Sequence, residues 1–287
     1  MSATIEIASG DARAQIALRG AELKGWSVGG AELIWPGDEK FWPDSAPVLF
    51  PVVGWTRDGI LVDGKRYPLG LHGFARQQDF VVVEQGPDRV LLRLAANAET
   101  RELFPFEFAL DAEYYIENNS LKIILHVKNE DDAVLSFACG LHPGFRWPLA
   151  GAQGTHVLRF DQPERQEVPV IAPGGLFSSQ MRPIPLQGRD LVLTSALFEE
   201  ALCFLDARSK GLEFSAGVGQ PGLRMELENF PHIALWSRPG ASFLCLEAWT
   251  GHGDPENFDG DIFAKPSMRR LNPGESARSA ATFTWRA

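Results

Sequence analysis

Short runs of alternating apolar and polar residues dominate this chain, and turn-forming residues interrupt them about every ten positions, a spacing typical of all-β proteins. In residues 106–114 and 121–128 every second side chain is apolar. A period of two places those side chains on one face of a β-strand. By the same criteria we expect strands at residues 4–8, 14–18, 24–28, 32–35, 80–84, 90–94, 202–206, 223–227, 232–236, 243–247 and 277–285.

Helical periodicity is scarce, and residues 100–104 and 195–199 are the only short candidates. Many short strands with few helices are typical of a large sandwich or barrel. Because no change of composition and no internal repeat divides the chain, we expect one all-β domain spanning residues 1–287.

Two stretches interrupt the pattern. Residues 36–59 contain four prolines, which break a strand ladder, among many aromatic and aliphatic side chains. We expect this loop to line a cleft or to cap the core. Residues 150–188 are rich in proline, glycine and glutamine, and we expect them to form a long excursion rather than a linker between domains.

The charge of the chain narrows the classes of partner. A formal net charge of −10 argues against a nucleic-acid or anionic-membrane surface, because both need clustered lysine and arginine. A neutral small molecule fits this charge better, although a local basic pocket could hold a phosphate. Nothing in the sequence indicates an oligomeric state.

The signal segments and the cysteines of the sequence both bear on the cellular location of the protein. No stretch approaches the roughly 20 consecutive apolar residues of a membrane helix, and residues 1–20 do not resemble a secretion signal. The cysteines at 139, 203 and 245 lie in apolar, strand-like segments. An odd number of cysteines without a secretion signal favours reduced, buried thiols. We therefore expect a cytoplasmic protein.

A carboxylate ends the most apolar strand of the chain. Residues 243–246 are all apolar, which is typical of a strand covered on both faces, and Glu247 follows them directly. A buried ionised glutamate is costly unless it is paired, so it acquires a partner or a raised pKa, and both serve proton transfer. The alternative is a glutamate at a strand end that points to solvent.

Two histidines, His72 and His142, stand beside glycines in apolar segments. Glycine next to a polar side chain often marks the close approach of a ligand. Arg76 lies on the same side as His72 if the segment is extended, and its planar fork suits hydroxyl or carboxylate oxygens. The alternative is that both histidines bond main-chain groups and that the arginine is solvated.

Nucleotide-binding loops, nucleophile elbows and close histidine pairs are absent from the sequence. Two histidines and a carboxylate can bind a metal, so a metal site remains an alternative. Its candidate ligands are dispersed along the chain: His72, His142, Asp206 and Glu247.

Three motifs together resemble a known family. They are HGFAR at residues 72–76, GLHPGF at residues 140–145, and the block from LWS to LEAWTG at residues 235–251. Their order and spacing are similar to those of the aldose 1-epimerase (galactose mutarotase) family, and more closely to its LacX-like branch. The resemblance covers the chain from about residue 5 to the last expected strand.

This resemblance implies a β-supersandwich of large antiparallel sheets and the interconversion of the α and β anomers of an aldose without a cofactor. It implies that Glu247 is the general base, which takes the proton of the anomeric hydroxyl. His142 is matched to the general acid, which protonates the ring oxygen. The residues matched to contacts with the sugar are His72, Arg76 and Asp206. From its side-chain chemistry, Trp249 is expected to supply an apolar face for the sugar ring, together with the aromatic loop.

The chain departs from the family at two places. Many relatives carry an arginine directly after the glycine that here is Gly54, whereas this chain has Trp55 and Thr56, with Arg57 two positions late. Ala248 stands where the family often has proline. The altered segment at Trp55 keeps a sugar-binding or regulatory protein without turnover as an alternative. The set of histidines and carboxylates keeps a metal-dependent sugar isomerase as another. A glycosidase is disfavoured, because such enzymes carry this fold mainly as an accessory part.

Overall fold

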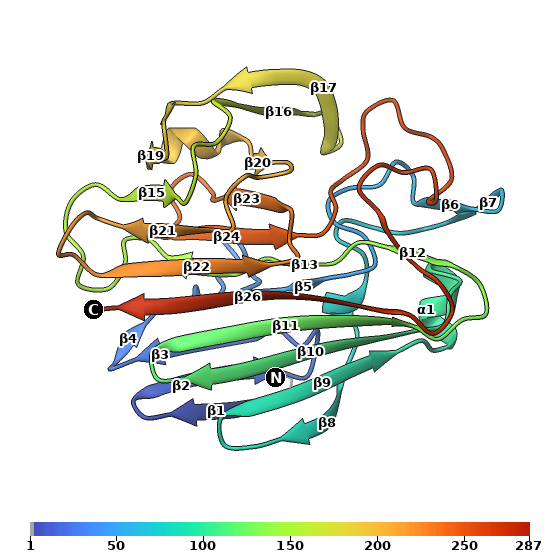
Figure 1. Ribbon diagram of the computed structural model, residues 1–287, viewed down its shortest axis with the longest axis horizontal. Coiled ribbons are helices and arrows are strands. Elements are labelled where there is room, and N and C mark those ends of the chain that lie inside the picture. The colour runs from blue at the N-terminus through green and yellow to red at the C-terminus, as the bar shows by residue number, and fades with distance from the viewer. Residues whose placement is uncertain (1–2) are drawn as a thin grey trace.

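The computed structural model describes residues 3–287 and is built almost wholly from antiparallel strands (Figure 1). Within this range, none of the helices has the length and apolar character needed to cross a bilayer. The expected dominance of β-structure is confirmed. The helical elements of the described residues are α1 (Ala98–Leu103) and the 3-10 turns η1 (Ala75–Gln77) and η2 (Ser195–Glu199).

The largest sheet has ten strands and runs the length of the molecule. All of its neighbouring strands are antiparallel. In spatial order they are β18 (Leu186–Gln187), β19 (Asp190–Val192), β15 (Val157–Phe160), β21 (Gly211–Ser215), β22 (Gly222–Glu228), β26 (Ser276–Arg286), β11 (Ser120–Asn129), β10 (Phe108–Glu117), β9 (Arg89–Ala95) and β8 (Val81–Gln85).

Two smaller sheets complete the sandwich. One has four strands, β1 (Thr4–Ser9), β2 (Ala12–Ala17), β3 (Leu23–Val28) and β4 (Ala31–Glu32). The other has six, namely β20 (Leu202–Phe204), β23 (His232–Trp236), β24 (Phe243–Trp249), β13 (Gly140–Leu141), β5 (Val48–Leu49) and, paired to β24, β14 (Gly144–Arg146). The remaining strands pair in twos: β6 (Ile60–Val62) with β7 (Lys65–Tyr67), β12 (Leu135–Phe137) with β25 (Arg269–Leu271), and β16 (Glu167–Ala172) with β17 (Leu176–Pro183).

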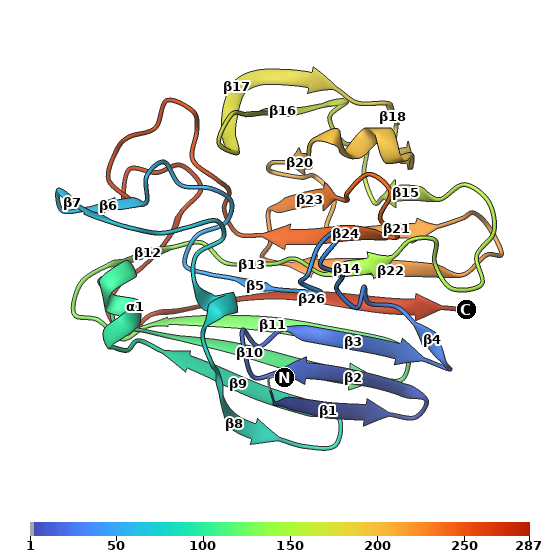
Figure 2. The ribbon, with the colours of Figure 1, turned by 180° about the vertical axis from the view of Figure 1, so that it is seen from behind.

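Both smaller sheets pack on the large one, as the two opposite views show (Figure 2). The ring of Phe145 in β14 lies 5.0 Å from that of Phe283 in β26, measured between centroids. At the other end, Phe160 in β15 and Phe204 in β20 lie 4.8 Å apart. Buried aromatic contacts of this kind hold the layers together.

The alternation of apolar positions correctly predicted the central hairpin of the large sheet. Strands β10 and β11 pair in continuous register, from Phe108 opposite Asn129 to Glu117 opposite Ser120. The alternate side chains of β10 that face the core are buried, and the others, apart from the buried Ala109, are half-buried or exposed. The period of two in the sequence therefore reports which face of the strand is covered.

Strand β24 is buried along its whole length, as its apolar sequence predicted. Leu244, Leu246 and Ala248 belong to the core between the sheets. The intervening positions, which include Glu247 and Trp249, must point to the opposite face, because successive side chains of a strand alternate. This alternation sets the carboxylate on the outer face of the six-stranded sheet.

The region of residues 150–188 differs from the expected excursion, because it contains strands β15, β16, β17 and β18. Many side chains of the β16–β17 hairpin are exposed, and its register shifts between Pro169 and Ile171. Such a hairpin lacks the apolar alternation from which strands are predicted. It lies above the outer face of the six-stranded sheet (Figure 1).

Candidate active site

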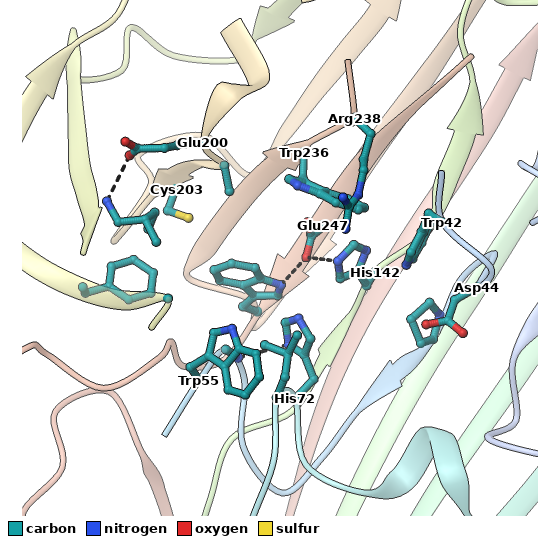
Figure 3. A pocket seen from close by; sticks show the side chains of 18 of the residues that line it. Trp42, Asp44, Trp55, His72, His142, Glu200, Cys203, Trp236, Arg238 and Glu247 are labelled. Atoms are coloured by element: carbon teal, nitrogen blue, oxygen red, sulfur yellow. Dashed lines mark hydrogen bonds and ion pairs between the residues drawn. The ribbon is translucent and has the colours of Figure 1, made fainter. Parts of the chain in front are cut away.

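A cavity of about 460 Å³ opens on the outer face of β24 (Figure 3). The loop of residues 42–55 and the β16–β17 hairpin contribute to its walls, so the aromatic loop does line a cleft as expected. Five of the six predicted site residues lie in its lining: Glu247, His142, His72, Arg76 and Trp249.

Glu247 occupies the floor of the cavity and is 2 % exposed. Its Oε2 accepts a hydrogen bond from Nε1 of Trp249 at 3.0 Å and lies 3.3 Å from Nε2 of His142. Its Oε1 has no hydrogen-bond partner within residues 3–287, so this oxygen is available to a ligand. Burial raises the pKa of Glu247 to about 8, and the indole N–H of Trp249 opposes the rise.

His142 stands at the corner between β13 and β14, and the following proline separates the two strands. The N–H of His142 donates to the carbonyl of Pro47 at 3.2 Å, and the carbonyl of Pro143 accepts from the N–H of Leu246 at 3.1 Å. Both bonds fix the corner beside β24. Burial lowers the pKa of His142 to about 3, and its Nδ1 has no partner within the described residues.

Together His142 and Glu247 hold one proton over a wide range. With pKa values near 3 and 8, the pair is singly protonated between these limits. The direct contact allows that proton to lie on either side chain. One group can therefore accept a proton while the other donates one, and the net charge of the buried pair does not change.

His72 faces the same space from another element. Its Nδ1 accepts a hydrogen bond from the N–H of Gly54 at 3.0 Å. Burial is the main cause that lowers the pKa of His72 well below its usual value, so the ring is neutral and carries its proton on Nε2. Nδ1 is therefore bound to the main chain, as the alternative interpretation of the sequence expected. Nε2–H remains as a donor beside His142, and the ring centroids of the two histidines lie 5.4 Å apart.

Arg76, on η1, forms an ion pair within the cavity lining. Its Nη1 lies 3.3 Å from Oδ2 of Asp44, and its Nη2 donates to the carbonyl of Leu71 at 3.4 Å. Burial and the charge of Glu22 raise the pKa of Asp44, and Arg76 opposes the rise. The guanidinium and carboxyl groups together offer donors and acceptors to a polyhydroxylated ligand.

Similarity to known proteins agrees with this geometry. A sequence model of the family described as aldose 1-epimerase matches residues 3–279. The chain belongs to the aldose 1-epimerase family.

Relatives of this aldose 1-epimerase family member include the chromosomal protein LacX of Lactococcus lactis subsp. lactis, which is 27 % identical over 268 residues, or 89 % of this chain and 90 % of the relative. A galactose mutarotase-like protein from Lactobacillus casei has a similar structure, with a TM-score of 0.92, 27 % identity and coverage of 99 % of this chain and 100 % of that one. A galactose mutarotase related enzyme from Lactobacillus acidophilus is also similar, with a TM-score of 0.91 and 26 % identity. The match covers 99 % of this chain and 98 % of that one. The expected galactose mutarotase-like fold and the LacX-like branch are thus confirmed.

Asp206 lies apart from the other predicted site residues. It follows β20 with a positive φ of 51°, and it lines a separate cavity of about 230 Å³. Its side chain is 81 % exposed and lies 3.8 Å from Nδ1 of His232. Because Asp206 does not line the cavity that contains Glu247, the expected contact with the same sugar has no support in the geometry.

The four candidate metal ligands are therefore not gathered at one place, because Asp206 lies outside the cavity that contains the other three. No group of three or more histidine, cysteine, aspartate and glutamate side chains in residues 3–287 is arranged to hold a metal ion.

The departure from the family at Gly54 changes the wall of the cavity. Trp55 lines the cavity and is 42 % exposed, whereas Arg57 lines a different, water-sized void of about 10 Å³. Arg57 therefore does not take the place of the arginine that many relatives carry in this segment. An aromatic face stands there instead.

Several lining residues were not singled out from the sequence. Asp44, Glu200 and Arg238 all border the cavity. Asp44 lies in the proline-rich aromatic loop, so an acid in a loop expected to line a cleft was the available signal. Glu200 accepts a hydrogen bond from the N–H of Ile171 and pairs with Arg182, which ties it to the β16–β17 hairpin. No local pattern marks Glu200 or Arg238.

Proposed function

We propose that this protein is an aldose 1-epimerase, which interconverts the α and β anomers of an aldose without a cofactor. The observation that carries the proposal is the 3.3 Å contact between Nε2 of His142 and Oε2 of Glu247 at the floor of the cavity. Anomer exchange removes one proton from the anomeric hydroxyl and adds one to the ring oxygen. A buried pair that shares one proton suits that balance.

Ring opening begins from the form in which Glu247 is ionised and His142 is protonated. Oε1 of Glu247, which has no hydrogen-bond partner among the described residues, takes the proton of the anomeric hydroxyl. Nε2 of His142 gives its proton to the ring oxygen as the bond from C1 to that oxygen breaks and the C1 carbonyl forms. The products are the free aldehyde, a protonated Glu247 and a neutral His142.

Ring closure uses the same two groups with reversed roles. After rotation about the bond from C1 to C2, the former ring oxygen attacks the other face of the carbonyl carbon. His142 takes the proton of that hydroxyl, and Glu247 gives its proton to the carbonyl oxygen. The other anomer forms, and the pair returns to its starting state. Each positioned proton transfer typically contributes about 10²- to 10⁴-fold to the rate.

The remaining polar groups orient the sugar in this proposal. Nε2–H of His72 and the guanidinium of Arg76 donate to sugar hydroxyls, and Asp44 accepts from them. The faces of Trp55 and Trp249 contact the apolar C–H groups of the ring. The cavity of about 460 Å³ is ample for a single sugar unit.

We also keep the cytoplasmic location as part of the proposal. It is supported by the three cysteines, all of which are buried and free, as expected for a reducing compartment.

The proposal is tested by following anomer exchange in a panel of pure α-aldoses, including hexose 6-phosphates, by polarimetry. We expect the protein to accelerate the approach to equilibrium for at least one aldose. Saturation-transfer NMR on the same panel tests the alternative of a protein that binds sugars without turnover. A sugar that binds without faster anomer exchange would identify a binding or regulatory protein. Activity that is lost on exhaustive chelation and restored by a metal would favour a metal-dependent isomerase.

A further inference from the structure

Three chain segments meet at glycines beside the wall that carries Trp55. A methyl group added at Gly54 would lie 2.8 Å from Cα of Gly253, and one added at Gly175 would lie 2.0 Å from Cδ1 of Trp55. Such distances are too short for any side chain. The loop after residue 53 and the segment after β24 therefore touch backbone to backbone, and the indole of Trp55 is seated on the turn of the β16–β17 hairpin at Gly175.

Asp254 connects these segments by hydrogen bonds. Its N–H donates to the carbonyl of Trp55 at 2.9 Å, and its carbonyl accepts from the N–H of Phe177 at 2.8 Å. Its side-chain Oδ2 accepts from the N–H of Arg57 at 2.8 Å. Trp55 and Phe177 both line the cavity, whereas Asp254 does not. One residue behind the wall thus holds both aromatic residues of the wall through their main chains.

Lys265 in turn holds Asp254. Its Nζ lies 2.9 Å from Oδ1 of Asp254, and the two side chains are 1 % and 5 % exposed. Burial lowers the pKa of Lys265, and the charge of Asp254 opposes this. Neither side chain contacts the cavity or the pair formed by His142 and Glu247.

A buried ion pair is a poor source of stability. The desolvation of two charges offsets most of their attraction, and well-packed apolar side chains often stabilise a protein as much or more. The two charges instead fix the orientation of the Asp254 carboxylate. One of its oxygens must stay toward Lys265 and the other toward the N–H of Arg57. That orientation fixes the segment that carries Trp55.

We propose that the Lys265–Asp254 ion pair is a positioning device for the sugar-binding wall formed by Trp55 and Phe177. It sets the affinity for the sugar and takes no part in proton transfer. This inference rests on the proposed function in that it takes the cavity as the sugar site.

The test measures KM and kcat separately, by polarimetry on the aldose that the wild-type protein converts best. For Lys265→Met we expect KM to rise about tenfold or more while kcat stays within about twofold, because a displaced wall loses contacts that the sugar makes equally in the ground state and the transition state. Lys265→Arg restores the charge and should return most of the affinity. Equal losses in KM and kcat, or an unchanged KM in folded protein, would overturn the inference.

A double-mutant cycle asks whether Lys265 acts through Trp55. Trp55→Ala alone should raise KM, and adding Lys265→Met should raise it by no more than about twofold further, because residues that act through one another are not additive. Full additivity of the two effects on KM would contradict the inference, because it would show that Lys265 does not act through Trp55.

The matched control removes a different ion pair. Arg224, in β22, pairs with Asp161 through two bonds of 2.6 and 2.9 Å outside the cavity. Arg224→Met should leave KM unchanged even if it lowers thermal stability. If Lys265→Met does not fold, Asp254→Asn combined with Lys265→Met leaves no unpaired buried charge, and its KM must also rise.

Failure of the inference differs from failure of the proposed function. A wild-type protein that accelerates no aldose would end the proposed function, and the dissociation constant from NMR would then replace KM in the same comparisons. A wild-type protein that neither binds nor converts any sugar overturns both. Normal wild-type turnover with an unchanged KM in folded Lys265→Met overturns the inference alone.

Discussion

Trp249 donates its indole N–H to the carboxylate of Glu247 from two positions further along the same strand, with Nε1 3.0 Å from Oε2. The donor stabilises the ionised form and so restrains the pKa of Glu247, which burial has raised to about 8. The sequence predicts for Trp249 only an apolar face for the sugar. The geometry gives it a second role, that of positioning the proposed base.

We expect Trp249→Phe to move the alkaline limit of activity upward. The pair loses its shared proton near pH 8 in the wild-type protein. A hydrogen bond to a charged group is worth about 1.5–3 kcal/mol, so its removal should raise this limit by about one to two pH units. The measurement is kcat/KM against pH by polarimetry. Trp26→Phe is the control. Because Trp26 lies in β3 of the four-stranded sheet, away from the cavity, this change should leave the alkaline limit of activity unchanged.

Substitution of the proposed base by its amide should stop turnover without unfolding the protein. Glu247→Gln keeps the shape of the side chain and its acceptor for Trp249, but it cannot take a proton. We expect kcat to fall by at least about 10²-fold, with sugar binding by NMR largely kept. Glu226→Gln, on the exposed face of β22, is the matched control. Full activity of a folded Glu247→Gln variant would show that the base lies elsewhere.

The same pair should shape the pH dependence of stability. The pKa of Glu247 is raised in the folded state, so its contribution is present below the unfolded pKa of about 4.3 and is lost as the pH rises through about 8. The pKa of His142 is lowered to about 3, so its contribution is present above about 6.5 and is lost as the pH falls. The two effects cancel between about pH 4.5 and 6.5.

Stability should therefore fall from about pH 6.5 to 8, by about 2 kcal/mol at about 1.4 kcal/mol per pH unit. Urea denaturation at several pH values measures this slope. Glu247→Gln has no proton to lose and should be flatter over the same range. An equal slope in both proteins would mean that other groups cause it.

The parts of the fold that the sequence predicted are those governed by local alternation. In β10 the covered face follows from every second residue, and in β24 an unbroken apolar run marks a strand covered on both faces. The β16–β17 hairpin was missed because its buried, half-buried and exposed side chains do not alternate, so burial leaves no period of two in its sequence. An alternating pattern reports a strand with one covered face, and it cannot report a strand whose burial is irregular.

Site residues follow the same division. Glu247 was found because an acid after an apolar run conflicts with burial, and His142 because it stands beside glycines in an apolar segment. Asp206 was misplaced because the turn after β20, with a φ of 51°, decides where its side chain points. Asp44 lies in an irregular loop, where no period exists. Tertiary turns, unlike strand faces, leave no repeating trace in the sequence.

One buried hydroxyl joins the four-stranded sheet to the ten-stranded one. Tyr114, in β10, donates to the carbonyl of Ala21, at the turn between β2 and β3, at 2.5 Å. Tyr114→Phe leaves that buried carbonyl without this partner, and we expect a loss of about 1–3 kcal/mol in the free energy of unfolding with kcat/KM unchanged. Tyr115→Phe, one position along and half-buried, should change stability by less than about 0.5 kcal/mol. If the two variants unfold at the same urea concentration, the hydrogen bond contributes nothing net to the contact between the sheets.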